Sequence, residues 1–192
     1  MSPKTNKLKL AKKEIEKIIN KSYCETDPEH SKTTHEWLMK LKPHADDALQ
    51  IAALAHDIER GTRTQSKKSK KRENYPAQKE KHSKRSAKII TQLLKKYDFD
   101  KKFVKKIQNL VLKHEVGGNE ESNTLMNADS LSFFQSNLTW YSQKHDKDTT
   151  KFKIKYMYNR MSPQAQKLAQ KIKIKNKKTN QLYKKTISET EK

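Results

Sequence analysis

An apolar segment, residues 48–55, constrains the fold of this chain more than any other feature of its sequence. Every residue in the segment except Gln50 is apolar. Two aspartates precede it, where carboxylates suit the positive end of a helix, and Gly61 follows it as a typical helix stop. Because a helix that is apolar on nearly all sides belongs inside a domain, the sequence predicts a buried central helix over residues 45–60.

The central helix ends in an adjacent histidine and aspartate, His56 and Asp57. This position carries both side chains to the edge of the core. Burying an imidazole and a carboxylate is costly unless they are paired or bound to a metal ion. The pair therefore marks a candidate functional site at the end of the central helix.

The spacing of apolar residues elsewhere predicts helices, and alternation of the strand type is weak. We expect these further helices over residues 8–20, 29–41, 79–97, 101–115, 120–136 and 150–174, the last with a break near Ser162-Pro163. The predicted fold is an all-α, single-domain helical bundle of about six to eight helices over residues 8–172. Residues 1–7 are expected to be disordered, and residues 173–192 to form a basic, flexible tail.

The chain carries 44 lysines and arginines against 22 acidic residues, a formal net charge of +22. Such an excess attracts polyanions, which makes nucleic acid a candidate partner, although surface lysines are also ordinary solvated residues. The basic segment 61–74 is correspondingly either a lid over an anionic substrate or a plain solvated loop.

The sequence also excludes several classes of protein. The single cysteine, Cys24, rules out a disulfide framework and a cysteine-rich zinc module. No apolar stretch approaches the ~18 residues of a membrane span, and the basic N-terminus lacks the apolar core of a signal peptide. We therefore expect a cytoplasmic protein with no membrane partner, and the sequence leaves its oligomeric state open.

Four other predicted helices each place one histidine or aspartate on an apolar face. These residues are His30, His82, His114 and Asp129. One such histidine is ordinarily a satisfied core residue, and pairwise hydrogen bonds could satisfy the whole set. A shared cation satisfies it more simply, because four imidazoles and two carboxylates, counting His56 and Asp57, form a mixed nitrogen and oxygen ligand set. We expect one or two divalent ions (Mn, Mg, Fe, Co, Ni or Zn), and we expect three further histidines to face solvent: His35, His44 and His145.

The order of these residues resembles the His…His-Asp…Asp signature of the HD-domain metal-dependent phosphohydrolases. The wider resemblance, to an uncharacterised bacterial subgroup of that superfamily, lies in residues 27–30, 37–38, 49–60, 114–118 and 128–134. It implies an HD-type helical domain in which His30, His56, Asp57 and Asp129 hold one metal ion. In members with two metals it implies that His82 and His114 bind the second ion and that Asp57 bridges the two.

The resemblance does not identify a substrate. The chain has Ile58-Glu59 where the guanosine-pentaphosphate hydrolases have a Glu-Asp pair, and it lacks the Gly-Tyr-Pro motif of cyclic-di-GMP phosphodiesterases. We therefore expect a metal-dependent phosphohydrolase acting on a nucleotide-like or other phosphorylated small molecule. Two alternatives remain open: a nucleic-acid-binding module with a structural metal, and a di-iron oxygenase.

Phosphoester hydrolysis requires an activated water and cations that neutralise the phosphoryl oxygens. The catalytic candidates are Asp57, Arg60 and Glu59. The candidates for binding substrate phosphate are Arg60, Lys79, Lys81, Lys155 and Arg160. Glu59 and Glu115 each follow a proposed ligand and are candidates for a general acid or base, but pairing with a surface lysine or arginine is the simpler expectation for both.

Overall fold

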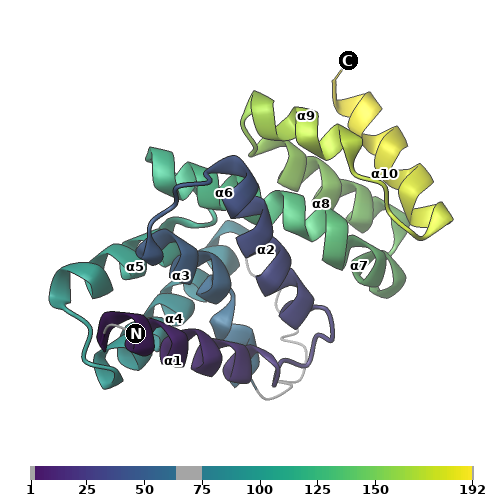
Figure 1. The fold of residues 1–192 in the computed structure, drawn as a ribbon. Coiled ribbons are helices and arrows are strands. Elements are labelled where there is room, and N and C mark those ends of the chain that lie inside the picture. The colour runs from purple at the N-terminus through teal and green to yellow at the C-terminus, as the bar shows by residue number, and fades with distance from the viewer. Residues whose placement is uncertain (1–2, 64–74, 192) are drawn as a thin grey trace.

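The predicted central helix is present as α3 (Asp47–Ala55) in the computed structural model, which describes residues 3–63 and 75–191 (Figure 1). Asp46 caps the helix by accepting a 2.9 Å hydrogen bond from the backbone N–H of Leu49. Five α3 side chains are fully buried, from Leu49 to Ala55. The helix ends immediately before His56, so the two functional candidates lie where the sequence predicted. Most of the predicted 61–74 loop, residues 64–74, lies outside the described residues.

The described residues form ten α-helices, one 3₁₀ turn and one π turn, and no β-strand occurs in 3–63 or 75–191. Besides α3, the elements are α1 (Pro3–Ile19), α2 (Asp27–Leu41), η1 (Ile58–Thr62), α4 (Tyr75–Lys96), α5 (Lys101–Lys113), α6 (Glu120–Ser132), η2 (Phe133–Asn137), α7 (Leu138–Lys144), α8 (Lys147–Asn159), α9 (Pro163–Lys171) and α10 (Lys177–Thr190). The all-α prediction is confirmed. The break predicted near Ser162-Pro163 is also confirmed, because Ser162 caps α9.

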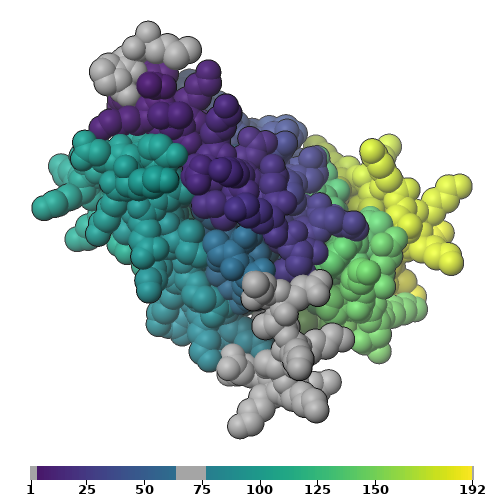
Figure 2. All heavy atoms as spheres, turned by 90° about the horizontal axis from the view of Figure 1, so that it is seen from below, coloured from purple at the N-terminus to yellow at the C-terminus, as the bar shows by residue number. Residues whose placement is uncertain are grey.

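Two hydrophobic cores, joined by α2, make up one compact domain. The first lies among α1 to α6 and the second among η2 and α7 to α10, with Trp37 and Leu41 of α2 packed against both. Figure 2 shows the same division, with the C-terminal helices in green and yellow gathered on one side of the molecule. The candidate site lies on the side of the first core, where α2, α3 and α6 pack together.

Both terminal expectations were wrong in the described residues. Residues 3–7, expected to be disordered, form the first turns of α1. The expected flexible tail 173–192 contains α10, in which Tyr183 is fully buried and donates a 2.8 Å hydrogen bond to the Ala169 carbonyl. Four residues with helical spacing, Leu182, Tyr183, Thr186 and Ile187, give α10 an inner face among its lysines. The helix count exceeds six to eight because neither α7 nor α10 was predicted.

Gly61 is required where η1 crosses α1. A Cβ atom at this position would lie 2.0 Å from the backbone oxygen of Ile18. Backbone cannot move aside as a flexible side chain can, so we expect Gly61→Ala to lower the free energy of unfolding by about 3 kcal/mol, the upper end of the cost of overpacking. Chemical denaturation measures the loss, with Lys17→Ala on the exposed face of α1 as the control. Equal stability of the two variants would contradict the close approach.

Candidate metal centre

The structure brings together all six residues that the sequence proposed as metal ligands. They come from five places in the chain, and each is at least 93% buried: His30 (3% exposed), His56 (0%), Asp57 (7%), His82 (7%), His114 (0%) and Asp129 (6%). Within the described residues, three groups of side chains could hold a metal ion: two consist only of these six residues, and the third joins Glu115 to His114 and Asp129. The convergence expected from the helical faces is therefore observed.

The first group of ligand atoms comes from His30, His56 and Asp129. His30 Nε2 lies 3.2 Å from His56 Nε2 and 3.1 Å from Asp129 Oδ1. Asp57 Oδ2 completes the group, 3.9 Å from His30 Nε2 and 3.8 Å from His56 Nε2. Two ligand atoms that each lie about 2.1 Å from a metal ion, in directions at a right angle to one another, are about 3.0 Å apart. The distances between these four atoms therefore fit one coordination shell.

The second group comes from Asp57, His82 and His114. It uses the other carboxylate oxygen of the aspartate: Asp57 Oδ1 lies 2.6 Å from His82 Nε2 and 3.8 Å from His114 Nε2. The two oxygens of Asp57 therefore face different groups. This is the arrangement that a carboxylate bridging two cations requires.

Backbone carbonyls fix the ring orientation of His56 and His114. Nδ1 of His56 donates to the Ala53 carbonyl at 2.9 Å, and Nδ1 of His114 donates to the Val111 carbonyl at 2.7 Å. A carbonyl only accepts, so the proton of each neutral ring sits on Nδ1 and the lone pair on Nε2. His114 Nε2 is buried and makes no hydrogen bond within the described residues, although Glu115 Oε1 and Asp57 Oδ1 lie 3.4 and 3.8 Å from it. A buried lone pair without a donor is costly, and a metal ion satisfies it.

Side chains fix the rings of the other two histidines. Ser132 Oγ donates to the His30 carbonyl at 2.9 Å and so accepts from His30 Nδ1 at 2.8 Å. His82 Nδ1 lies 2.5 Å from Glu59 Oε2. All four rings are therefore held through Nδ1 and aim Nε2 inward, which is how metal-binding histidines are usually oriented by the groups behind them.

The carboxylates of the cluster favour protonation of His56 and His82 when no cation is present, because they raise the pKa of both rings against the effect of burial. Burial opposes protonation of His56, but Asp57 and Asp129 outweigh it and raise its pKa to about 9. Burial likewise opposes ionisation of Asp57, but Arg60 and His56 hold the pKa of Asp57 well below its usual range. A proton on His56 therefore competes with any cation for the same Nε2 atom.

We expect metal affinity to rise with pH up to about pH 9, because binding must release the His56 proton. Below that pH the apparent affinity rises by about tenfold per pH unit for one proton released. Stability of the metal-free protein changes in the opposite direction: protonated His56 stabilises the fold below its ordinary pKa of 6.5, and this contribution is lost as pH rises through about 9. Calorimetric titration with Mn²⁺ in buffers of different ionisation enthalpy measures the release, with exposed His44→Gln as the control. Binding without proton release would contradict the assignment.

Two of the predicted catalytic residues, Arg60 and Glu59, contact proposed ligands on the side away from the centre of the cluster. Arg60 donates from Nε to Asp57 Oδ2 at 2.9 Å and from Nη1 to Asp27 Oδ1 at 3.1 Å, so two carboxylates already engage the predicted phosphate ligand. Glu59 is 2% exposed and pairs with His82, Arg63 and Arg85. Pairing of Glu59 with a basic residue was expected, but the expectation that this pair lies on the surface was wrong, because Glu59 is buried.

Arg160 links two buried carboxylates of the cluster. Its Nη2 lies 2.5 Å from Asp129 Oδ2, and its Nη1 lies 2.7 Å from Glu115 Oε2. Lys79 Nζ lies 2.5 Å from the other oxygen of Glu115, which is only 5% exposed. Burial opposes ionisation of Glu115, but these two cations and His114 hold its pKa well below its usual range. Glu115 is therefore buried, and the expectation that it pairs on the surface was also wrong.

The remaining predicted phosphate contacts, Lys81 and Lys155, are exposed. Lys153 was not predicted; it is 8% exposed and lies on α8, seven residues before Arg160, which caps the C-terminal end of that helix. The available signal was this helical spacing. Of the three histidines expected to face solvent, His44 and His145 are exposed, whereas His35 is only partly exposed and its Nε2 lies 3.3 Å from Gln50 Oε1.

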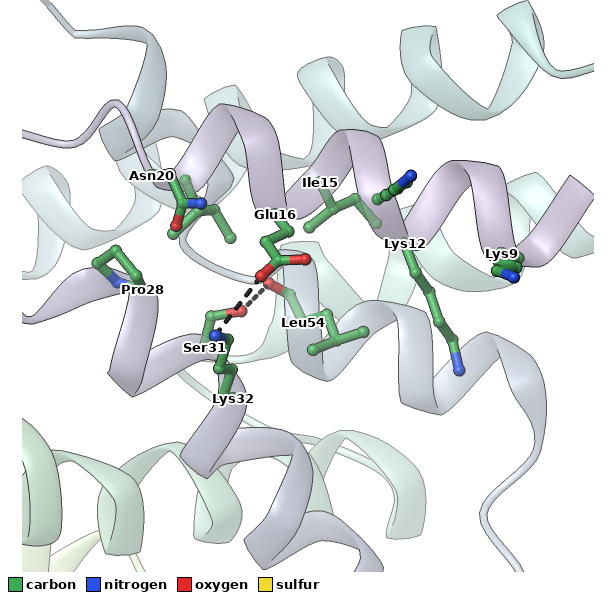
Figure 3. A pocket seen from close by; sticks show the side chains of 11 residues that line it. Lys9, Lys12, Ile15, Glu16, Asn20, Pro28, Ser31, Lys32 and Leu54 are labelled. Atoms are coloured by element: carbon green, nitrogen blue, oxygen red, sulfur yellow. Dashed lines mark hydrogen bonds and ion pairs between the residues drawn. The ribbon is translucent and has the colours of Figure 1, made fainter.

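A separate cavity of about 240 Å³ lies among α1, α2 and α3 and is lined by none of the six proposed ligands (Figure 3). Lys32 pairs with Glu16 across it at 3.5 Å, and Ser31 Oγ donates to the Leu54 carbonyl at 2.7 Å. The second contact joins α2 to α3 next to His30. It therefore helps to hold His30 against the central helix.

Fold and site together define a class: an all-α protein with a buried histidine and aspartate cluster that could hold metal ions. A family model described as a domain of unknown function, DUF4202, matches residues 7–182, and the chain belongs to that family. The match runs past residue 172 into α10, beyond the end that we expected for the domain. Comparison with curated proteins and with solved structures gave no match. None of the helices in the described residues has the length and apolarity needed to cross a membrane.

Proposed function

We propose that this protein is a metal-dependent phosphohydrolase of the HD superfamily, acting on a nucleotide-like or other phosphoester substrate. The observation that carries the proposal is the position of Asp57 between two groups of possible ligands, with His114 Nε2, which makes no hydrogen bond within the described residues, in the second group. A mixed set of imidazoles and carboxylates suits a divalent first-row metal or magnesium. The order of His30, His56-Asp57 and Asp129 along the chain supports the superfamily assignment.

The residues present fit one or two divalent ions. His30, His56, Asp129 and Asp57 Oδ2 would hold the first, and His82, His114 and Asp57 Oδ1 the second. A divalent cation supplies positive charge to phosphoryl oxygens and lowers the pKa of water. Side chains of the protein orient the proposed ligands and place further positive charge near them.

The protein groups around the ligands have separate tasks in this proposal. Arg60 holds the Asp57 carboxylate in a fixed orientation through the contact with Oδ2. Glu59 does the same for the His82 ring through Nδ1. Arg160 and Lys79 place positive charge beside Asp129 and Glu115, where it can stabilise charge that develops on a phosphoryl group.

Metal analysis followed by a substrate panel tests the proposal. We expect the purified protein, loaded with Mn²⁺, Co²⁺ or Mg²⁺, to release phosphate or alcohol from model phosphoesters and nucleotides, and to lose this activity in EDTA. A metal-loaded protein that hydrolyses no phosphoester in a broad panel would contradict it. Iron on purification with oxygen consumption would indicate a di-iron oxygenase instead. Salt-sensitive polynucleotide binding that survives EDTA, without hydrolysis, would indicate the nucleic-acid-binding alternative.

A further inference from the structure

A groove of about 1150 Å³ is lined by α2, η2, α7, the end of α9 and residues 172–176, which join α9 to α10 (Figure 1). None of the six proposed metal ligands lines this groove. Pockets for one small ligand usually have volumes of about 300–1,000 Å³. The groove is therefore large enough for a segment of a polymer, and it is a site separate from the candidate metal centre.

Three exposed lysines form a row along one part of the groove: Lys171, Lys173 and Lys175. Two isoleucines that alternate with them, Ile172 and Ile174, are each 8% exposed. The backbone is extended at Ile172, directly after α9 (φ −63°, ψ 130°). Successive side chains of an extended segment point to opposite sides, so burial of the isoleucines directs this lysine row outward.

The positive charge of the lysine row is not neutralised by neighbouring side chains. Within residues 3–63 and 75–191, the side chains of these three lysines form no hydrogen bond or ion pair. Lys40 adds a fourth positive charge, because its Nζ lies 4.5 Å from the centroid of the Trp37 ring in the wall of the groove. The groove-lining residues that the structure describes include one carboxylate, that of Glu29. The groove therefore carries an excess of positive charge, which attracts a polyanion.

The groove also offers apolar surface. Trp37 and Leu168 are partly buried and line it, and the Trp37 indole N–H donates a 2.8 Å hydrogen bond to Gln135 Oε1. A ligand that carries an apolar ring beside each negative charge matches both features. In single-stranded nucleic acid the phosphates bind lysines, and the unpaired bases pack against aromatic and apolar side chains. A duplex covers the faces of its bases, and an acidic peptide carries either a charge or an apolar group at each residue.

We propose that this groove binds single-stranded nucleic acid. The lysine row contacts phosphates, and Trp37 and Leu168 contact bases. The proposal goes beyond the proposed function and does not rest on it, because the groove shares none of the six proposed metal ligands. Binding in the groove requires neither a metal ion nor hydrolysis.

Fluorescence anisotropy of a labelled oligothymidylate of about 12 nucleotides, within the usual range of site sizes, tests the groove in EDTA. We expect the full-length protein to bind it, and glutamine at all three positions of the lysine row to weaken binding on the order of 100-fold at about 0.1 M salt. Each phosphate contact contributes about 0.7 to the slope of log affinity against log salt, so the slope should become shallower by about 2. The matched control places glutamine at three exposed lysines of α5, Lys101, Lys102 and Lys105, and should bind like the wild type. Circular dichroism verifies that both variants keep their helices.

Tryptophan fluorescence locates the bound strand. The chain has two tryptophans, so Trp140→Phe leaves Trp37 as the single indole. We expect the emission of Trp37 to change as the oligonucleotide is added, over the same concentrations as the anisotropy. Saturable binding that leaves this emission unchanged would place the strand elsewhere and overturn the proposal.

Other polyanions provide the remaining comparison. Tighter binding of a DNA duplex, of polyglutamate or of vesicles containing phosphatidylserine would identify a different partner. Equal weakening in the lysine-row variant and the α5 variant would assign binding to the general surface charge. Each of these results would overturn the proposal, as would failure of the wild type to bind the oligonucleotide at low salt. None of them would decide the proposed function, which is measured as hydrolysis by the metal-loaded protein.

Discussion

Replacement of Asp57 by asparagine is expected to weaken metal binding by more than about 100-fold, because even changes behind metal ligands cost about 10–100-fold. The effect is large because one residue serves both ligand groups, through Oδ2 in the first and Oδ1 in the second. We expect kcat/KM for the best substrate of the panel to fall by on the order of 10³-fold, the cost of losing a preorganised electrostatic group. Metal content by mass spectrometry and phosphate release measure the two effects on one preparation.

The fold itself should survive this substitution. Asparagine is nearly isosteric with aspartate, and Arg60 retains its second partner, Asp27. Circular dichroism verifies the helical content, and Asp148→Asn, an exposed acid on α8, serves as the matched control. An Asp57→Asn protein that retains two metal equivalents at wild-type affinity would show that the carboxylate is not a shared ligand.

The central helix and its polar end could be predicted because burial leaves a direct signal in the sequence. The run of apolar residues from Ala48 to Ala55 has no polar face except Gln50, so it could only be interior. The same reasoning located the other ligands, since a histidine on an apolar helical face must point inward. Convergence of the faces followed from packing such helices around one core.

The residues behind the ligands could not be assigned in the same way. Glu59 and Glu115 were expected on the surface because an adjacent helical residue points ~100° away from its neighbour. Both follow the last residues of α3 or α5, where the helix has ended and this angle no longer applies. Lys153 was missed because a buried lysine is rare, although its seven-residue spacing from Arg160 was a signal in the sequence.

The C-terminal helix, α10, shows a third limit of prediction from the sequence. Lysine and threonine make up half of the residues of α10, and its polar composition alone predicted a flexible tail. Burial of Tyr183 depends on residues of other elements, among them Phe134, whose tilted ring has its centroid 4.8 Å from that of Tyr183. Such a contact joins residues about 50 positions apart, so it depends on tertiary packing rather than local propensity.

Replacement of Arg160 by methionine is expected to destabilise the metal-free protein by about 3–5 kcal/mol, the cost of removing one partner from a buried ion pair. The side chains of Arg160, Glu115 and Asp129 are only 9%, 4% and 8% exposed, so water cannot replace the lost guanidinium. Chemical denaturation in EDTA measures the loss. Arg63→Met provides the control, because that arginine is 42% exposed and its partner Glu59 retains Arg85. We expect the control to cost less than about 1 kcal/mol.

Saturating metal should restore part of the stability lost in Arg160→Met. A cation bound by Asp129 Oδ1 compensates that carboxylate directly, whereas Glu115 loses Arg160 and keeps only its contacts with Lys79 and His114. The loss measured with metal should therefore be smaller than the loss in EDTA but larger than zero. The comparison separates binding at Asp129 from general stabilisation, since a cation bound elsewhere would raise the stability of wild type and variant equally. An identical loss with and without metal would exclude Asp129 from the ligand set even if the protein binds metal.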